Sequence, residues 1–127
     1  NNFIGDKGLE VLSNNEYVNL DYISLIGNKI SKYGLKYLDK FKNLVYVLLS
    51  HNEIEGNFEI PQNLEKIKHL DISNNGINDI DIQNLNVKTK KIQNLNISNT
   101  NINENTLLKL LDKDLFNLSN LNINSSM

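Results

Sequence analysis

Cysteine and arginine are both absent from the 127 residues of this chain. Without cysteine the chain has neither a disulfide scaffold nor a thiolate zinc site, and this absence is typical of a protein in a reducing compartment. All 13 basic residues are lysines, and 15 acidic residues bring the net charge to −2. Because arginine supplies the two-pronged hydrogen bonds that bind guanine and phosphate, we expect no nucleic-acid partner.

Long apolar runs are missing as well. No stretch reaches the 18 apolar residues that a membrane-spanning helix needs, so we expect no membrane segment. Residues 1–20 lack the basic start and the apolar block of a signal peptide. Together with the missing cysteine, these features favour a cytoplasmic protein or a secreted effector that acts in the cytosol of a host.

Asparagine, by contrast, occupies 25 positions, and apolar residues recur at a fixed spacing. The pattern L-x-x-L-x-L-x-x-N-x-I, with Ile or Val allowed for Leu, occurs at residues 20–30, 44–54 and 67–77, and again at 92–102 with Thr100 at the Asn position. A cut-off copy starts at Leu118, and residues 2–12 match the second half of a copy at 28–38. The copies start 24, 23, 25 and 26 residues apart, which indicates a repeat architecture.

This spacing resembles the leucine-rich repeat family over nearly the whole chain. The resemblance implies an α/β solenoid, a leucine-rich repeat horseshoe with a parallel β-sheet on its concave face and helical or irregular connections on its convex face. We expect one array over residues 1–127, with four complete repeats that start near 20, 44, 67 and 92 and partial repeats at 1–19 and 118–127. Because both ends fall inside a copy, we expect a fragment of a longer array.

The connections between copies differ in pattern. Residues 2–12 and 28–41 resemble ribonuclease-inhibitor-like repeats, whereas Gly56 and the Ile60-Pro61 pair resemble the extended segment of plant-type repeats, so the subclass is mixed. Apolar residues at helical spacing predict helices over 31–42 and 103–116, the second with Asn105 or Thr106 as its N-cap. Residues 77–91 alternate and predict an extended or irregular segment, and Pro61 argues against a helix through 56–63.

Alternation within each copy predicts a strand with one buried side. In the third copy Leu70 and Ile72 should face inward, while His69, Asp71 and Ser73 should face outward. Asn28, Asn52 and Asn75 follow the strands, and asparagine both tolerates a left-handed backbone and donates and accepts hydrogen bonds. The resemblance implies that these three form an inward-pointing structural ladder between copies. Thr100 and Ser126 take that position later in the chain and are shorter, so the ladder should weaken.

The outward positions of the strands change in character along the chain. In the C-terminal half they are Asn and Ser, which we expect to form a solvated face, with a glycan-binding ladder as the alternative. In the N-terminal half they are aromatic, apolar or charged, as in many protein interfaces. An alternative is that Ile26 and Leu48 only fill a sheet face, since such residues favour strands. The predicted partner-binding residues are Tyr22, Ile26, Tyr46, Leu48, His51, His69 and Asp71.

Catalysis is a weaker hypothesis for the same face. His69 and Asp71 lie two positions apart, near enough to pair, and Ser50 and Ser73 share their face, which allows a Ser/His/Asp arrangement. A flat strand face, however, supplies no oxyanion hole and no enclosed pocket. We therefore expect no enzyme, no catalytic residue, no metal site and no cofactor. The pairs Asp79 with Asp81 and Asp112 with Asp114 should be solvated rather than cation sites.

The resemblance implies a protein–protein interaction module that binds a protein partner through its concave face, in a pathogen or in a regulatory protein. Two other functions remain open: a structural spacer array, and the substrate-recognition arm of a larger enzyme. Nothing in the sequence selects the partner. Open strand edges at both ends also allow end-to-end self-association.

Overall fold

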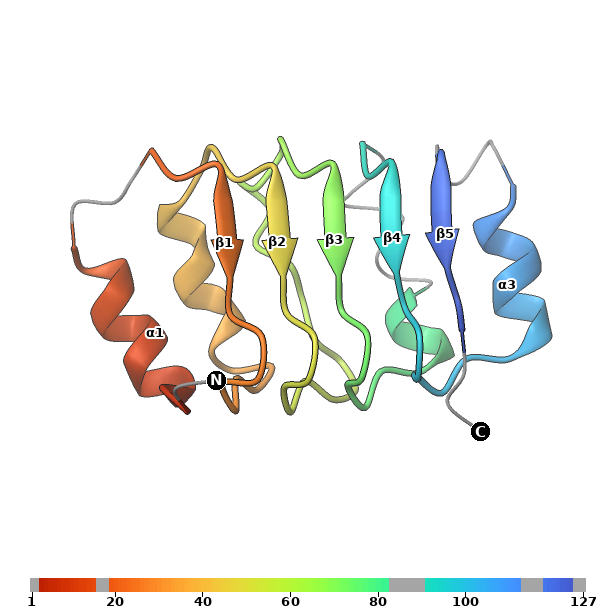
Figure 1. The fold of residues 1–127 in the computed structure, drawn as a ribbon, viewed down its shortest axis with the longest axis horizontal. Coiled ribbons are helices and arrows are strands. Elements are labelled where there is room, and N and C mark those ends of the chain that lie inside the picture. The colour runs from red at the N-terminus through yellow and green to blue at the C-terminus, as the bar shows by residue number, and fades with distance from the viewer. Residues whose placement is uncertain (1–2, 16–18, 83–90, 113–117, 125–127) are drawn as a thin grey trace.

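The computed structural model describes residues 3–15, 19–82, 91–112 and 118–124. Within these ranges the chain forms a five-stranded, all-parallel sheet whose strands follow one another in sequence order, with helices between them (Figure 1). The strands are β1 (Tyr22–Ser24), β2 (Tyr46–Leu48), β3 (His69–Asp71), β4 (Asn94–Asn96) and β5 (Asn120–Asn122). The predicted α/β class and parallel sheet are therefore confirmed.

The register of the sheet matches the alignment of the sequence copies. The central residues of the strands lie side by side, in the order Ile23, Val47, Leu70, Leu95 and Leu121. The pairing also continues past the strands, since the amide of Leu49 donates to the carbonyl of Asp71 at 2.7 Å. Residues at the same position of successive copies are thus neighbours in space.

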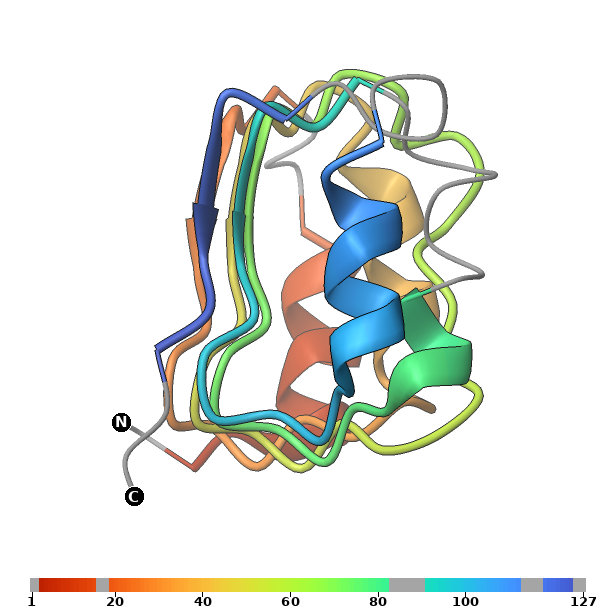
Figure 2. The same ribbon diagram turned by 90° about the vertical axis from the view of Figure 1, so that its right-hand side faces the viewer.

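The helices lie on one side of the sheet. They are α1 (Gly5–Ser13), the 3₁₀ helix η1 (Leu35–Lys40), a helical turn at 79–82 and α3 (Glu104–Leu110). Figure 2 shows this layer to the right of the strands and shows that β1 and β5 stand further from the helices than β3. Within the described ranges no helix covers the other face of the sheet, which is gently concave and is called the open face below. No helix in the described ranges is long and apolar enough to cross a membrane.

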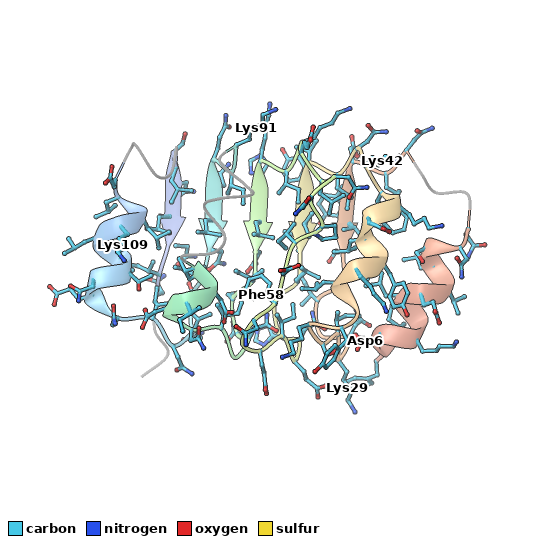
Figure 3. All side chains as sticks on the ribbon, turned by 180° about the vertical axis from the view of Figure 1, so that it is seen from behind. Asp6, Lys29, Lys42, Phe58, Lys91 and Lys109 are labelled. Atoms are coloured by element: carbon cyan, nitrogen blue, oxygen red, sulfur yellow. The ribbon has the colours of Figure 1, made fainter. Side chains whose placement is uncertain are left out.

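The core lies between the sheet and the helix layer. The central side chains of β1 to β4 are buried, and so are the apolar residues two positions further on, such as Leu49 and Ile72. The connection between β2 and β3 has no helix at 56–63, as Pro61 predicted. There Phe58 is buried in the middle of the helix layer (Figure 3). An aromatic side chain thus fills the space that a helix occupies in neighbouring connections.

Two predicted connections differ from the structure. Of residues 31–42 only Leu35–Lys40 are helical, and the helix is 3₁₀. A 3₁₀ helix has three residues per turn, so apolar residues at every third position lie on one side of it. The extended prediction for 77–91 is wrong at 79–82, which are helical, while 83–90 lie outside the described residues.

The cap predicted for α3 is also wrong. Asn103, rather than Asn105 or Thr106, is the N-cap, and its Oδ1 accepts a hydrogen bond from the Thr106 amide at 3.0 Å. An N-cap side chain accepts from the third helical residue, which here is Thr106 itself. The described helix ends at Leu110, and residues 113–116 of the predicted segment lie outside the described residues.

The turn after each of the first four strands has a left-handed residue at the same position of the copy. These residues are Gly27, His51, Asn74 and Asn99, with φ angles of 69°, 57°, 54° and 56°. The sequence pattern had suggested Asn28, Asn52 and Asn75, one position too late. Because the strands end at Leu48 and Asp71 and the chain then turns, the prediction that Ser50 and Ser73 face outward is wrong: both are buried.

Candidate functional site

The open face is held in shape by asparagines in the turns that follow the strands. Asn52 Oδ1 accepts hydrogen bonds from the amides of Asn28 and Ile30 at 3.0 and 2.8 Å. Its Nδ2 donates to the carbonyls of Leu25 and Leu49 at 2.8 and 2.9 Å. One side chain therefore joins the turn after β1 to the turn after β2.

Asn75 does the same one strand further on. Its Oδ1 accepts from the Ile54 amide at 3.0 Å, and its Nδ2 donates to the Leu49 carbonyl, also at 3.0 Å. Asn28 Oδ1 accepts from the Ile4 amide at 3.4 Å. Thr100, at the equivalent position after β4, donates to the Ile97 carbonyl at 2.6 Å, within its own turn. Ser126 lies outside the described residues.

Three rings form a row across the first three strands, because their positions are in register. The Tyr22 and Tyr46 rings are 5.9 Å apart at 43°, and the Tyr46 and His69 rings stack in parallel at 4.1 Å. Tyr22 and Tyr46 are 52% and 42% exposed. Beyond the rings, His69 Nδ1 lies 2.6 Å from Asn94 Nδ2, which extends the row onto β4.

The last residues of the strands form a second row beside the rings. We call this the terminal row, and it consists of Ser24, Leu48, Asp71, Asn96 and Asn122. Asp71 Oδ1 accepts from the amide and hydroxyl of Ser73 at 3.0 and 2.6 Å. Asn96 Oδ1 accepts from the Ser98 amide at 3.0 Å in the same way. These local bonds, typical of Asx turns, fix the two side chains at the ends of β3 and β4.

Residues of both rows line a shallow hollow of about 310 Å³ on the open face. Four predicted residues meet there: Tyr46, Leu48, His69 and Asp71. The hollow is completed by side chains that sequence analysis had assigned to a solvated face, namely Asn94, Asn96, Asn120 and Asn122. An amide side chain carries no binding signal by itself, so only its register with the aromatic copies could have indicated this.

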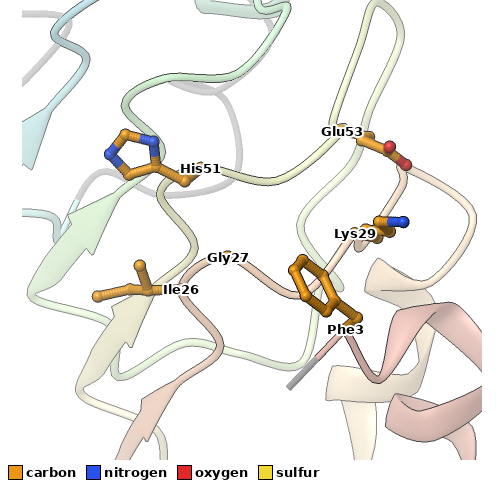
Figure 4. Close-up of a pocket in the computed structure, with 6 residues that line it drawn as sticks. All are labelled: Phe3, Ile26, Gly27, Lys29, His51 and Glu53. Atoms are coloured by element: carbon orange, nitrogen blue, oxygen red, sulfur yellow. The ribbon is translucent and has the colours of Figure 1, made fainter. Parts of the chain in front are cut away.

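The remaining predicted residues lie elsewhere. Ile26 and His51 line a separate hollow of about 390 Å³ with Phe3, Lys29 and Glu53, beyond the ends of the strands (Figure 4). There the Lys29 ammonium lies 5.1 Å from the centre of the Phe3 ring. Tyr22 lines neither hollow and stands at the end of the aromatic row. The structure thus divides the predicted patch between two places.

The side chains that could have suggested catalysis are engaged separately. His69 bonds to Asn94, and Asp71 bonds to Ser73, whose own hydroxyl is buried. No Ser–His–Asp relay is formed by these residues. Among the residues that the structure describes, no three or more His, Cys, Asp or Glu side chains gather where they could hold a metal ion.

The prediction that Asp79 and Asp81 are solvated is wrong. Asp81 is only 1% exposed and accepts from the amides of Asn57 and Asn78 at 2.7 and 3.0 Å. Asp79 accepts from the Asn103 amide at 2.7 Å. Both carboxylates therefore join neighbouring connections rather than await a cation. Of the second pair, Asp112 is exposed and Asp114 lies outside the described residues.

Charge on the open face is sparse. Of the outward strand residues only Asp71 carries a carboxylate, and none carries an ammonium group. The hollow therefore combines stacked rings, one anion and several amides. No protein-family model and no curated protein sequence matches this chain.

Proposed function

We propose that this chain is a leucine-rich repeat array of the solenoid type and that its open, concave sheet face binds a protein partner. The five repeat positions in register support the array, as do the asparagines that join one turn to the next. Confinement of the helices to the opposite side leaves the face accessible (Figure 2). The proposal gives the described residues a role in binding and none in catalysis.

One observation carries the binding part of the proposal, namely the exposure of the aromatic row. Tyr22 and Tyr46 are 52% and 42% exposed on a regular sheet, with their rings tilted against each other and the Tyr46 ring stacked on His69. Exposed rings next to polar groups are typical of interaction sites, because burial of a tyrosine contributes a large apolar area and its hydroxyl keeps a partner. A structural spacer would gain nothing from such a row.

The proposal is tested with the double variant Tyr46→Ala/Leu48→Ala. Wild type and variant are immobilised and incubated with cytosol from the native or host cell, and captured proteins are quantified by mass spectrometry. We expect specific partners to fall by about tenfold or more, as for the loss of interface anchors. Tyr33→Ala is the matched control, because Tyr33 is 71% exposed but lies in the connection that leads into η1.

Two results would contradict the proposal. One is unchanged capture by the double variant; the other is an equal loss in Tyr33→Ala. Urea unfolding of all three proteins accompanies the capture, so that a loss of binding is separated from a loss of folding. A spacer array predicts no difference among the three.

A further inference from the structure

The terminal row presents a definite order of chemical groups to the open face. Asp71 Oδ1 is engaged by Ser73, whereas Asp71 Oδ2 has no hydrogen-bond partner in the described part of the chain. The carboxylate is half-buried and lines the hollow beside Leu48. A carboxylate that loses water on binding needs a hydrogen-bonded cation in return, or the binding is weakened.

The next two strands carry a complementary pattern. Asn96 Oδ1 and Asn122 Oδ1 accept from the amides of Ser98 and Asn124 at 3.0 and 3.3 Å. Neither Nδ2 group donates a hydrogen bond within the described ranges, and both residues line the same hollow. Neighbouring strands are about 4.8 Å apart. Across the sheet the row is therefore apolar at Leu48, anionic at Asp71, and donating at the two asparagines.

We propose that the partner places a lysine or arginine side chain on Asp71 Oδ2, with an apolar side chain over Leu48 and Tyr46 and carbonyl or carboxylate oxygens at Asn96 and Asn122. This inference rests on the proposed function, protein binding at the open face. The alkyl stem of the basic residue packs along the edges of the stacked Tyr46 and His69 rings. An acidic segment is disfavoured, because Asp71 is the one charged side chain among the described outward strand residues.

The fold itself supplies a matched variant for the test. Asn96 stands at the register position next to Asp71 and makes the equivalent bond at the same 3.0 Å. Asp71→Asn therefore keeps the Asx turn and changes only the presented atom, from an anionic acceptor to a neutral donor. Asn96→Asp makes the opposite change on β4. Asp71→Asn thus removes the negative charge of the row, and Asn96→Asp adds a second negative charge one strand further along.

The experiment selects a phage-displayed library of random linear peptides against four proteins: wild type, Asp71→Asn, Asn96→Asp and Tyr46→Ala/Leu48→Ala. We expect wild type to enrich peptides with a basic residue beside an apolar one. Asp71→Asn should lose the preference for the basic residue, and Asn96→Asp should select a second one. A peptide selected by wild type should bind Asp71→Asn about tenfold to a hundredfold more weakly, the usual effect of losing a hydrogen bond to a charged group.

The outcomes separate this inference from the proposed function. If wild type enriches peptides that depend on Tyr46 and Leu48 but carry no basic preference, or that bind Asp71→Asn equally well, the inference is overturned and the binding face stands. If no enriched peptide depends on Tyr46 and Leu48, the binding face itself fails and the inference fails with it. Added salt should weaken the wild-type complex more than the Asp71→Asn complex, because screening acts on the charge pair.

Discussion

The turns after the first three strands and the turn after β4 are built on one backbone pattern but with different side chains. The Gly76 amide donates to the Ile54 carbonyl at 2.8 Å, and the Asn101 amide donates to the Ile77 carbonyl at 2.9 Å. The backbone therefore joins successive turns equally in both regions. In the N-terminal region the Asn52 side chain also joins them through backbone groups of both turns, whereas the turns after β3 and β4 are bridged by a bond from Asn99 Nδ2 to Asn74 Oδ1 at 3.0 Å.

The open face differs between the same two regions. Over β1 to β3 it carries rings and an apolar side chain; over β4 and β5 it carries amides. The backbone pairing is parallel and in register throughout. One scaffold therefore keeps its geometry while its side chains differ in the hydrogen bonds that they add to the turns and in the chemistry of the face, so each can be changed separately.

The largest effect on stability is expected from Asn52→Ala. The amides of Asn28 and Ile30 and the carbonyl of Leu25 would lose their partner. The free energy of unfolding should therefore fall by about 3 kcal/mol. Thr100→Ala, which removes a single bond within one turn, should cost about 1 kcal/mol. Urea unfolding with unchanged slope measures both. Equal losses would show that the two turns do not differ in strength.

Asp81→Ala should have the next largest effect. Asp81 is buried and holds the amides of Asn57 and Asn78, so its loss leaves two donors unpaired and costs about 2 kcal/mol. Asp79→Ala is the matched variant, because Asp79 accepts a hydrogen bond from Thr106 Oγ1 of α3 at 2.6 Å and so joins the following connection instead. Hydrogen exchange should show α3 opening more readily in Asp79→Ala than in Asp81→Ala. The reverse order would contradict the assignment of the two carboxylates to different neighbours.

Thr100→Asn tests the comparison in the stabilising direction. An asparagine there would bring an amide oxygen to the Ile77 amide, as Asn75 brings Oδ1 to the Ile54 amide. We expect the free energy of unfolding to rise by about 1 kcal/mol, the usual net gain from one such bond. Thr100→Ser keeps the hydroxyl and should change little. If the Asn variant is no more stable than the Ser variant, the turn after β4 does not accept the bridge.

Much of the scaffold could be predicted because five copies repeat one apolar spacing. That spacing placed Leu70 beside Leu95 and aligned Tyr46 with His69. The left-handed position was missed by one residue because Asn74 and Asn75 both tolerate a positive φ. Gly27, which holds that position in the first complete copy, was the available signal.

The helical turn at 79–82 was missed for a different reason. Asp79 to Ile82 alternate polar and apolar residues, which favours a strand. Asn78 Oδ1 instead accepts from the Asp81 amide at 3.2 Å, while Asp81 Oδ2 accepts from the Asn78 amide. This reciprocal capping box begins a helix, and its spacing of polar residues three apart was visible in the sequence.

The outward position of a candidate site residue could be predicted only for residues that belong to a strand. Leu48 and Asp71 lie inside strands, and alternation placed them on the open face. Ile26 and His51 follow the strand ends, where alternation no longer applies, and they line another hollow. Which two side chains bond, as Asp71 does with Ser73, depends on turn geometry that spacing alone does not define.

The smallest expected effect concerns the N-terminal end of the helix layer. The hydrogen bond from Lys7 Nζ at 2.8 Å, followed by that from Tyr37 Oη at 3.0 Å, lowers the pKa of Glu10 below its ordinary 4.5. A lowered pKa in the folded protein contributes stability above pH 4.5, and this contribution is lost as the pH falls through the folded value.

Glu10→Gln should therefore be slightly less stable than wild type near neutrality and equally stable well below pH 4.5. The same hydrogen bond to Glu10 is the main cause of the raised pKa of Lys7. Wild type should therefore lose the stability that Lys7 contributes only above pH 10.5. Urea unfolding of wild type and Glu10→Gln across this range measures both effects.

The control for this prediction lies at the other end of the helix layer. The contact between Asp79 and Thr106 involves neither Lys7 nor Glu10, so Thr106→Val should lower stability without changing the effect of Glu10→Gln at any pH. A Glu10→Gln difference that persists in acid would place the contribution of Glu10 in packing rather than in its charge.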